Sequence, residues 1–258
     1  EIEQQGILDF WKINIPFTTT IRFSSFTPRI EYTTRFTPMG KNFRIRAAFP
    51  TGIKRGAIRH EIPFGIQERA EAEFAAMNWI DYGEPSHGLA LLNRGIPANN
   101  VDDGIMLLTL FRSIAMEYKT ESVLSYNEGE PHEFHYAVMP HGSDSDSDII
   151  REGKNFNFPS VLTSILEEKK LPQGSFVPNK KNVFVSGLRS RGDEIFLRVY
   201  EGTGVKTSCS LSLPPGGLMV ADADGLEREK GPYREADAPL EIDFKPFEIK
   251  NFLFRRTK

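Results

Sequence analysis

Apolar and polar residues alternate with a period of two along much of the chain. The runs IEYTTRF (30–36) and FRIRAAF (43–49) are rich in β-branched and aromatic residues, and TPMGKN between them predicts a hairpin turn. Similar alternation predicts further strands at 89–93, 105–111, 133–139, 182–188, 194–200, 207–213 and 247–254. Many short strands at this spacing are typical of sandwiches, so we predict an all-β fold.

Two stretches favour a helix instead. QERAEAEFAAMN (67–78) is rich in Ala and Glu, which have high helix propensity. SDIIREGKNFN (147–157) predicts a short helix with Ser147 or Asp148 as its N-cap, because a short polar side chain can accept a hydrogen bond from a free N–H of the first turn.

A break in the pattern occurs at 166–182, where charged residues, Pro and Gly are frequent and after which new strands begin. We therefore predict two domains, a large antiparallel β-sandwich over 1–168 and a smaller β-sandwich over 169–258. The 20 Phe and 17 Pro residues suit short strands separated by firm turns.

Composition excludes several classes of protein. The net charge of −3 over 258 residues gives no broad attraction to nucleic acid or to an anionic membrane. Cys209 is the single cysteine, so an internal disulfide is excluded, and we expect it to be a small core side chain. No run of about 18 apolar residues is present to span a membrane.

The chain starts at Glu1 without a signal segment, and it has no Asn-x-Ser/Thr sequon. We interpret it as a fragment or processed piece of a longer protein. The localisation stays open, and the missing sequons favour a cytoplasmic bacterial protein.

The segment HEFHYAVMPHGSDSDSD (132–148) holds three of the five histidines and three aspartates, which invites a metal-site interpretation. His132 and His135 are three residues apart on a predicted strand, so they point to opposite faces and cannot share one metal ion. His141 follows a proline and is expected to begin a loop. We therefore predict no zinc site here, since zinc needs three or four convergent ligands.

The SDSDSD tract resembles the start of a calcium loop, which needs Gly at its sixth position and Glu at its twelfth. Counted from Asp144, these positions are Ile149 and Asn155, so the pattern fails and we predict a solvated acidic loop. DADG (222–225) fails because its glycine comes too early.

Arg191-Gly192-Asp193 is a tripeptide that some adhesion receptors bind, but it lies between two predicted strands and is expected to be a hairpin turn. The signatures of nucleophile elbows, phosphate-binding loops, dinucleotide-binding loops and paired cysteines are absent from the sequence. His60 and His87 are isolated and are expected to be structural or surface residues.

The stretch LLNRGIPANNVDDG (91–104) predicts a polar loop between two strands. Its Arg, Asn and Asp side chains could bind sugar hydroxyls through fork-like hydrogen bonds, although an ordinary connection has the same composition.

Taken in order, eight segments resemble the C-terminal β region of glycoside hydrolase family 38, the α-mannosidases. The segments are HEIPFG (60–65), FAAMNWIDY (74–82), GLALLNRG (88–95), LLTLFRS (107–113), HEFHYAVMPHG (132–142), NFNFP (155–159), NVFVSGLRSRGDEIFLRVYEGTG (182–204) and FEIKNFLF (247–254). The family typically has E-x-P-F-G, Asn-Trp before Val/Ile-Asp, Gly-x-x-Leu-Leu-Asn, Tyr-Ala-Leu-x-Pro-His-x-Gly and a final Pro-x-Glu-Ile strand. The resemblance covers residues 30–254.

This resemblance implies a fold, and it implies which part of the longer protein carries the catalytic residues. It implies a galactose-mutarotase-like supersandwich followed by a smaller sandwich, with 74–81 extended and 66–73 as a loop or short helix. The family's enzymes are retaining mannosidases whose nucleophilic aspartate and zinc ligands lie in an N-terminal catalytic part, and those motifs are absent here. We therefore expect no catalytic residue, metal ligand or cofactor in this chain, zinc in the missing catalytic domain, and an inactive fragment.

The expected partners are the N-terminal catalytic domain of the same protein and a mannose-containing carbohydrate, with a role in mannose metabolism. One family loop reaches the substrate with an arginine and corresponds best to 91–104. Arg94, with Asn93 beside it, is thus the candidate substrate-binding residue, although the family's Tyr-Gly after Leu-Leu-Asn is Arg94-Gly95 here.

Two other functions remain open. A free-standing carbohydrate-binding module would present a row of exposed aromatics, and Trp11, Trp79 and the tyrosines form no such row in the sequence. An adhesion domain would use Arg191-Gly192-Asp193.

Overall fold

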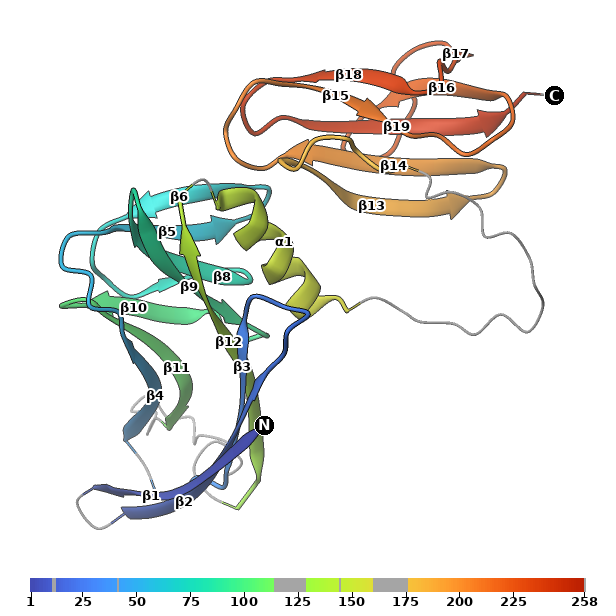
Figure 1. Cartoon of the computed structure of the whole chain (residues 1–258). Coiled ribbons are helices and arrows are strands. Elements are labelled where there is room, and N and C mark those ends of the chain that lie inside the picture. Colours follow the sequence, from blue (N-terminus) through green and yellow to red (C-terminus); the bar gives the residue numbers. More distant parts are fainter. Residues whose placement is uncertain (11–12, 41, 114–128, 144, 160–175, 258) are drawn as a thin grey trace, which may run out of the picture. The chain divides into compact units, whose positions relative to one another are not determined.

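The computed structural model describes all residues except 11–12, 41, 114–128, 144, 160–175 and 258. The chain forms two compact units (Figure 1). The first comprises Glu1–Ile62, Gln67–Ser145 and Ile149–Pro159, and the second comprises Pro63–Ile66, Asp146–Asp148 and Ser160–Lys258. The predicted boundary between 168 and 169 lies outside the described residues and stays a prediction.

Two antiparallel sheets face each other in the first unit. The larger has the order β1 (Ile2–Phe10), β2 (Ile13–Phe23), β3 (Ile30–Phe36), β12 (His132–Gly142), β9 (His87–Asn93), β8 (Trp79–Glu84), β5 (Ala57–Ile62) and β6 (Gly65–Arg69). The smaller has the order β4 (Phe43–Pro50), β11 (Ile105–Ser113), β10 (Ala98–Asp102) and β7 (Phe74–Ala75). The alternating apolar residues of both sheets form one core that includes Ile15, Ile80, Leu91, Met106 and Leu108.

Helix α1 (Asp146–Asn157) covers the outer face of the larger sheet and buries Ile149, Ile150 and Phe156 (Figure 1). Full burial of each such side chain stabilises the fold by about 1.5–3 kcal/mol. The close approach depends on Gly153, because a Cβ there would lie 2.7 Å from Cδ1 of Trp79. The predicted helix is confirmed, but Ser145 is its N-cap residue in place of Ser147 or Asp148.

The second unit is a smaller sandwich. One sheet has the order β13 (Val183–Arg191), β14 (Glu194–Glu201), β19 (Ile249–Arg256), β16 (Leu218–Ala223) and β17 (Arg234–Glu235), and the other pairs β15 (Thr207–Leu211) with β18 (Leu240–Phe244). Its core includes Leu197, Val199, Leu211, Val220 and Phe254. Cys209 is 1% exposed in this core, as predicted. The all-β sandwich class is thus confirmed.

Two predicted connections are wrong. Strands β3 and β4 do not form a hairpin, because β3 pairs with β2 and β12 while β4 pairs with β11 in the other sheet. The predicted loop 91–104 is largely strand, since β9 continues to Asn93 and β10 begins at Ala98. In both cases alternation and composition describe the segment itself, but they do not identify the strand that pairs with it.

The helix suggested for 67–78 does not form. Of 66–73, expected to be a loop or short helix, residues 70–73 are indeed a loop, but 66–69 belong to β6 (Gly65–Arg69). Pairing at the sheet edge overrides the helix propensity of Ala and Glu. The extended conformation expected for 74–81 agrees with β7 and the start of β8. The acidic loop expected for the SDSDSD tract is wrong for its second half, since Asp146–Asp148 form the first turn of α1, whereas Ser143 and Ser145 lie outside the helix.

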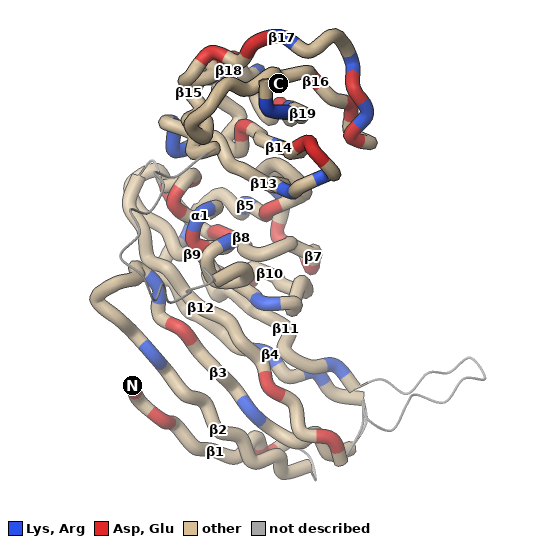
Figure 2. Tube along the Cα trace, turned by 90° about the vertical axis from the view of Figure 1, so that its right-hand side faces the viewer, with Lys and Arg blue, Asp and Glu red and all other residues tan. Residues whose placement is uncertain are grey.

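Acidic and basic residues are interspersed along the described chain and do not separate into oppositely charged halves (Figure 2). No helix of the described residues is long and apolar enough to cross a membrane.

Candidate functional site

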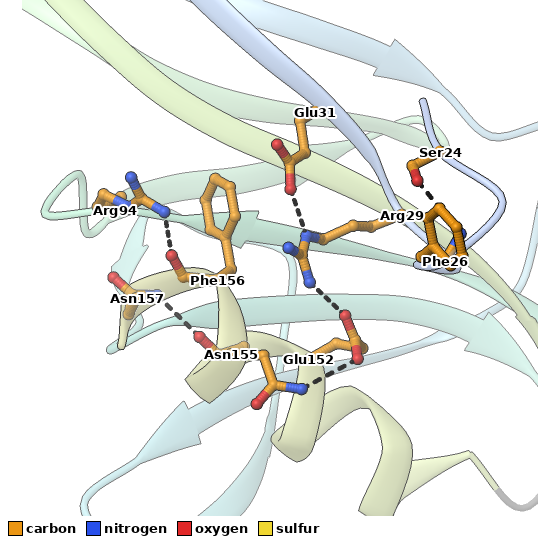
Figure 3. A network of polar contacts seen from close by, with 10 residues as sticks. Ser24, Phe26, Arg29, Glu31, Arg94, Glu152, Asn155, Phe156 and Asn157 are labelled. Atoms are coloured by element: carbon orange, nitrogen blue, oxygen red, sulfur yellow. Dashed lines mark hydrogen bonds and ion pairs between the residues drawn. The ribbon is translucent and has the colours of Figure 1, made fainter. Parts of the chain in front are cut away.

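Arg94 lies in the turn between β9 and β10, and its side chain is directed at the last turn of α1 (Figure 3). Its Nη2 donates a hydrogen bond to the carbonyl oxygen of Phe156, and the guanidinium lies 4.5 Å from the centre of the Phe156 ring. A cation is favourable at the carbonyl end of a helix. Arg94 therefore joins the β9–β10 turn to α1 while its residue remains exposed.

A second arginine approaches the same ring. The Arg29 guanidinium lies 5.5 Å from the Phe156 ring centre, its Nε donates to Glu31 at 2.8 Å, and its Nη1 pairs with Glu152 (Figure 3). Its side chain is only 11% exposed, whereas Arg94 is exposed and has no carboxylate partner among the described residues. Of the two arginines, Arg94 is thus the one whose guanidinium can reach a ligand.

Asn93 is 1% exposed, and its hydrogen bonds stabilise the turn on its buried side. Its Oδ1 accepts a hydrogen bond from the Ile96 amide at 3.2 Å, and its carbonyl oxygen accepts one from Asn157 Nδ2 at 2.9 Å. Its Nδ2 is buried without a hydrogen-bond partner in the described part of the chain. In this conformation Asn93 offers nothing to solvent, so the sugar contact predicted for it would require the turn to open.

His141 belongs to β12 and does not begin a loop, which corrects the expectation from Pro140. Its Nε2 lies 2.6 Å from Oδ1 of Asp81, whose side chain is fully buried, and Arg59 Nη2 lies 2.7 Å from the other oxygen of Asp81. Arg59 and His141 therefore share one buried carboxylate on the outer face of the larger sheet.

The imidazole of His141 lies against Gly88, which is paired with Gly83 across β8 and β9. A Cβ at Gly88 would lie 2.5 Å from Cε1 and Nε2 of His141, and one at Gly83 would be 3.2 Å from Cα of Gly88. The absence of side chains at both positions lets the ring reach Asp81. Three of the quoted motifs, Ile-Asp, Gly-x-x-Leu-Leu-Asn and Pro-His-x-Gly, thus meet at this contact.

Ser145, His141 and Asp81 resemble a hydrolytic triad, since Ser145 Oγ lies 2.7 Å from His141 Nδ1. However, Nδ1 also lies 2.9 Å from the Gly142 carbonyl oxygen, which can only accept a hydrogen bond. With an acceptor at each ring nitrogen, the doubly protonated imidazolium is favoured, and an imidazolium cannot act as a general base. Burial alone lowers the pKa of His141, but the hydrogen bonds to Asp81 and Gly142 outweigh it and raise the pKa overall.

Glu61 lies beside this cluster and is 7% exposed. Its Oε2 accepts a hydrogen bond from the Asn78 amide at 2.8 Å, which links the E-x-P-F-G and Asn-Trp motifs. Burial raises the pKa of Glu61, and burial lowers the pKa of Lys154 on α1, while each charge stabilises the other. The role of these residues is to hold α1 against the sheet.

The remaining histidines do not form a metal site. His132 packs against Phe111 and Phe134, while His135 contacts Thr33 and Glu133 on the other face of β12, as predicted. His60 is 1% exposed and its Nε2 lies 3.0 Å from Asn99 Oδ1. Among the described residues, no three His, Cys, Asp or Glu side chains converge on one point, so zinc does not fit here.

Gly192 and Asp193 form the turn of the β13–β14 hairpin, with φ of 60° at Gly192, as predicted. Arg191 Nη1 donates to the Glu227 carbonyl oxygen, so its guanidinium is engaged within the domain. Trp79 is 1% exposed beneath α1 and cannot stack on a sugar, while Trp11 lies outside the described residues.

Sequence reasoning missed the Asp81–His141 contact because the residues are 60 positions apart and the strand was expected to end at Pro140. The signal that could have found it is the pair Gly83 and Gly88, which flank a strand connection and leave one sheet face open for a large side chain.

Comparison with known proteins agrees with this architecture. Residues 3–118 match the model of the glycosyl hydrolases family 38 C-terminal domain, and residues 182–252 match that of the family 38 C-terminal beta sandwich domain. The chain is 27% identical to alpha-mannosidase 2C1 of Mus musculus over 230 residues, and 23% identical to an alpha-mannosidase of Saccharomyces cerevisiae over 254 residues. These matches cover 81% and 82% of this chain but only 21% and 22% of the relatives.

A solved structure of an alpha-mannosidase from Enterococcus faecalis V583 superposes with a TM-score of 0.76 at 18% identity, over 93% of this chain and 29% of the other. A family 38 protein from Enterococcus faecalis gives a TM-score of 0.77 at the same identity. These likenesses show the shared fold. The chain spans about a fifth of the length of the curated relatives it matches.

Proposed function

This chain belongs to glycoside hydrolase family 38, as its C-terminal β region, and we propose that it serves an α-mannosidase without carrying the reaction itself. In this proposal the sandwiches support the N-terminal catalytic domain and help shape the site for a mannose-containing carbohydrate. The supporting observation is that the two family models match C-terminal domains, while the matched relatives are four to five times longer than the matched part.

The proposal places the retaining chemistry and the zinc ion in the catalytic domain. Zinc would supply a Lewis acid that binds sugar hydroxyls there. The described residues of this chain contain no three convergent metal ligands, so no step of the reaction is assigned to them.

Arg94 is the residue of this chain that we assign to the carbohydrate. Arg94 is an exposed residue, and its guanidinium donates one hydrogen bond, to the Phe156 carbonyl oxygen, so further donors can face a ligand. Hydroxyls remote from the bond that breaks are bound equally well before and during the reaction, so an arginine that binds them would contribute to substrate binding more than to the chemical step.

Steady-state kinetics of the longer protein on an aryl α-mannoside test this assignment. Arg94→Ala should raise KM about tenfold, with kcat nearly unchanged, since one hydrogen bond from a charged group contributes about 1.5–3 kcal/mol. Arg29→Ala is the matched control, because Arg29 contacts the same Phe156 ring without being exposed. Equal effects of the two substitutions would mean that Arg94 only holds α1.

The alternative function, a free-standing carbohydrate-binding module, gains no support from Trp79, which is buried. Tight binding of mannose oligosaccharides by this chain alone would favour it.

A further inference from the structure

Three arginines lie together on the outer face of the smaller sheet of the first unit. Arg44 and Arg46 are successive outward positions of β4, and Arg112 on β11 lies directly opposite Arg44 in the antiparallel register. Like charges directly opposite each other on neighbouring strands repel, so this arrangement needs a compensating anion.

Arg44 and Arg112 border a surface hollow of about 360 Å³, which is lined by Asn42, Phe43, Arg44, Glu73, Arg112 and Ser113. Arg46 lies outside this lining and adds its charge through Glu73, 3.4 Å away. Its size is at the lower end for small-molecule sites.

Only one carboxylate offsets this charge among the described residues. Glu73 accepts from Arg44 Nη1 at 2.8 Å through both of its oxygens, and it lies 3.4 Å from Arg46 Nη2. The Arg44 hydrogen bond is the main reason that the pKa of Glu73 is lowered. Arg112 has no acidic partner in the described part of the chain, and the buried Nε of Arg46 has no hydrogen-bond acceptor there.

We propose that this hollow binds an oxyanion, namely a phosphate group, either free or as the ester of a sugar. Guanidinium groups present forked N–H donors that match the oxygens of phosphate, and three of them exceed what Glu73 can neutralise. Arg112 is the residue with the most unused donors and is the main ligand. This site does not depend on the mannosidase assignment, since it includes none of the residues assigned to the carbohydrate, and Arg94 lies in the β9–β10 turn.

The test is an NMR titration of the 258-residue chain with sodium phosphate at fixed low ionic strength, with amide shifts near Arg44 and Arg112 as the readout. We expect saturable binding that Arg112→Gln weakens at least tenfold. Arg35→Gln is the matched control, because Arg35 is an exposed strand arginine on the larger sheet that is already paired with Glu133. Glu73→Gln should tighten binding, since it removes the competing carboxylate.

Three results would overturn the proposal. The first is the absence of saturable phosphate binding to the native chain. The second is equal weakening of binding by Arg112→Gln and Arg35→Gln. The third is binding that appears only in Glu73→Gln, which would mean that the Glu73 carboxylate itself occupies the site. Titration with a hexose 6-phosphate and with the neutral hexose distinguishes the sources of the phosphate. Tighter binding of the ester than of inorganic phosphate, with no binding of the neutral sugar, identifies a sugar phosphate, and equal binding identifies free phosphate.

Discussion

At the scale of single residues, His141 connects the motifs that identify this chain. Its imidazole contacts Asp81 on β8, the Gly142 carbonyl oxygen and the hydroxyl of Ser145, the N-cap residue of α1. These contacts favour the charged imidazolium, so the histidine has a structural role that depends on pH.

The pKa of folded His141 is raised above the usual value of about 6.5. Its stabilising contribution is therefore fully present below the pKa of the unfolded chain and is lost as the pH rises through the folded pKa. We predict that His141→Gln lowers the free energy of unfolding more at pH 5.5 than at pH 9.5. Urea titrations followed by Trp79 fluorescence measure this, since Trp79 is buried in the same unit. A pH-independent difference would contradict the prediction.

Gly88 gives a second prediction. Gly88→Ala places a Cβ 2.5 Å from the imidazole of His141, so it should destabilise the first unit by about 1–3 kcal/mol. Gly142→Ala is the control, because its Cβ would meet only the Ser86 carbonyl oxygen, at 3.9 Å. In a His141→Ala background Gly88→Ala should be less harmful, because only the 3.0 Å approach to Cα of Gly83 remains, as thermal unfolding of the four variants would reveal. A full effect without the imidazole would disprove the steric explanation.

The sequence allowed the faces of His132 and His135 to be predicted from strand alternation. It did not reveal His141 as a buried partner of Asp81, because a proline usually ends a central strand. Here Pro140 lies within β12 and is exposed.

At the scale of elements, Glu201 joins two connections of the second unit. Its buried carboxylate accepts hydrogen bonds from Asn182 Nδ2, Thr203 Oγ1 and the amides of Thr203, Gly204, Val205 and Phe247. Burial alone would raise the pKa of Glu201, but these donors outweigh it and lower the pKa. The carboxylate thus fixes the β14–β15 and β18–β19 connections together.

Glu201→Gln should destabilise the second unit by at least about 3 kcal/mol, because an amide accepts fewer of these bonds and brings two donors of its own. The lowered pKa means that the contribution is present above the unfolded pKa and lost as the pH falls through the folded pKa. Calorimetry should show the difference between the variants shrinking in acid. Both tryptophans precede residue 80, so their fluorescence transition should be unchanged, and a shift of it would contradict the prediction.

Strands with clean alternation, such as β3 and β14, were predictable nearly to their ends. Strand β10 was not, because its sequence ANNVD is typical of a loop. Asn99 is nevertheless fully buried, since its Oδ1 pairs with His60 and its Nδ2 donates to the Pro97 carbonyl oxygen. A polar residue is compatible with a core when its hydrogen bonds are satisfied. The sequence does not reveal this pair, because His60 is 39 positions from Asn99.

At the scale of the whole molecule, composition and turn spacing predicted the all-β class, and the order of short motifs predicted the family. Which strands pair could not be predicted, because alternation is the same in either sheet. The contact between Arg94 and α1 could not be predicted either, because Arg94 and Phe156 are 62 positions apart in the sequence.

We propose that this chain is part of a longer α-mannosidase and does not itself catalyse the reaction. The most direct measurement compares turnover of an aryl α-mannoside, with and without added zinc, by the 258-residue chain and by the longer protein. The account predicts zinc-dependent turnover by the longer protein and none by this chain at equal molar concentration. Turnover by this chain that grows in proportion to its concentration would contradict it.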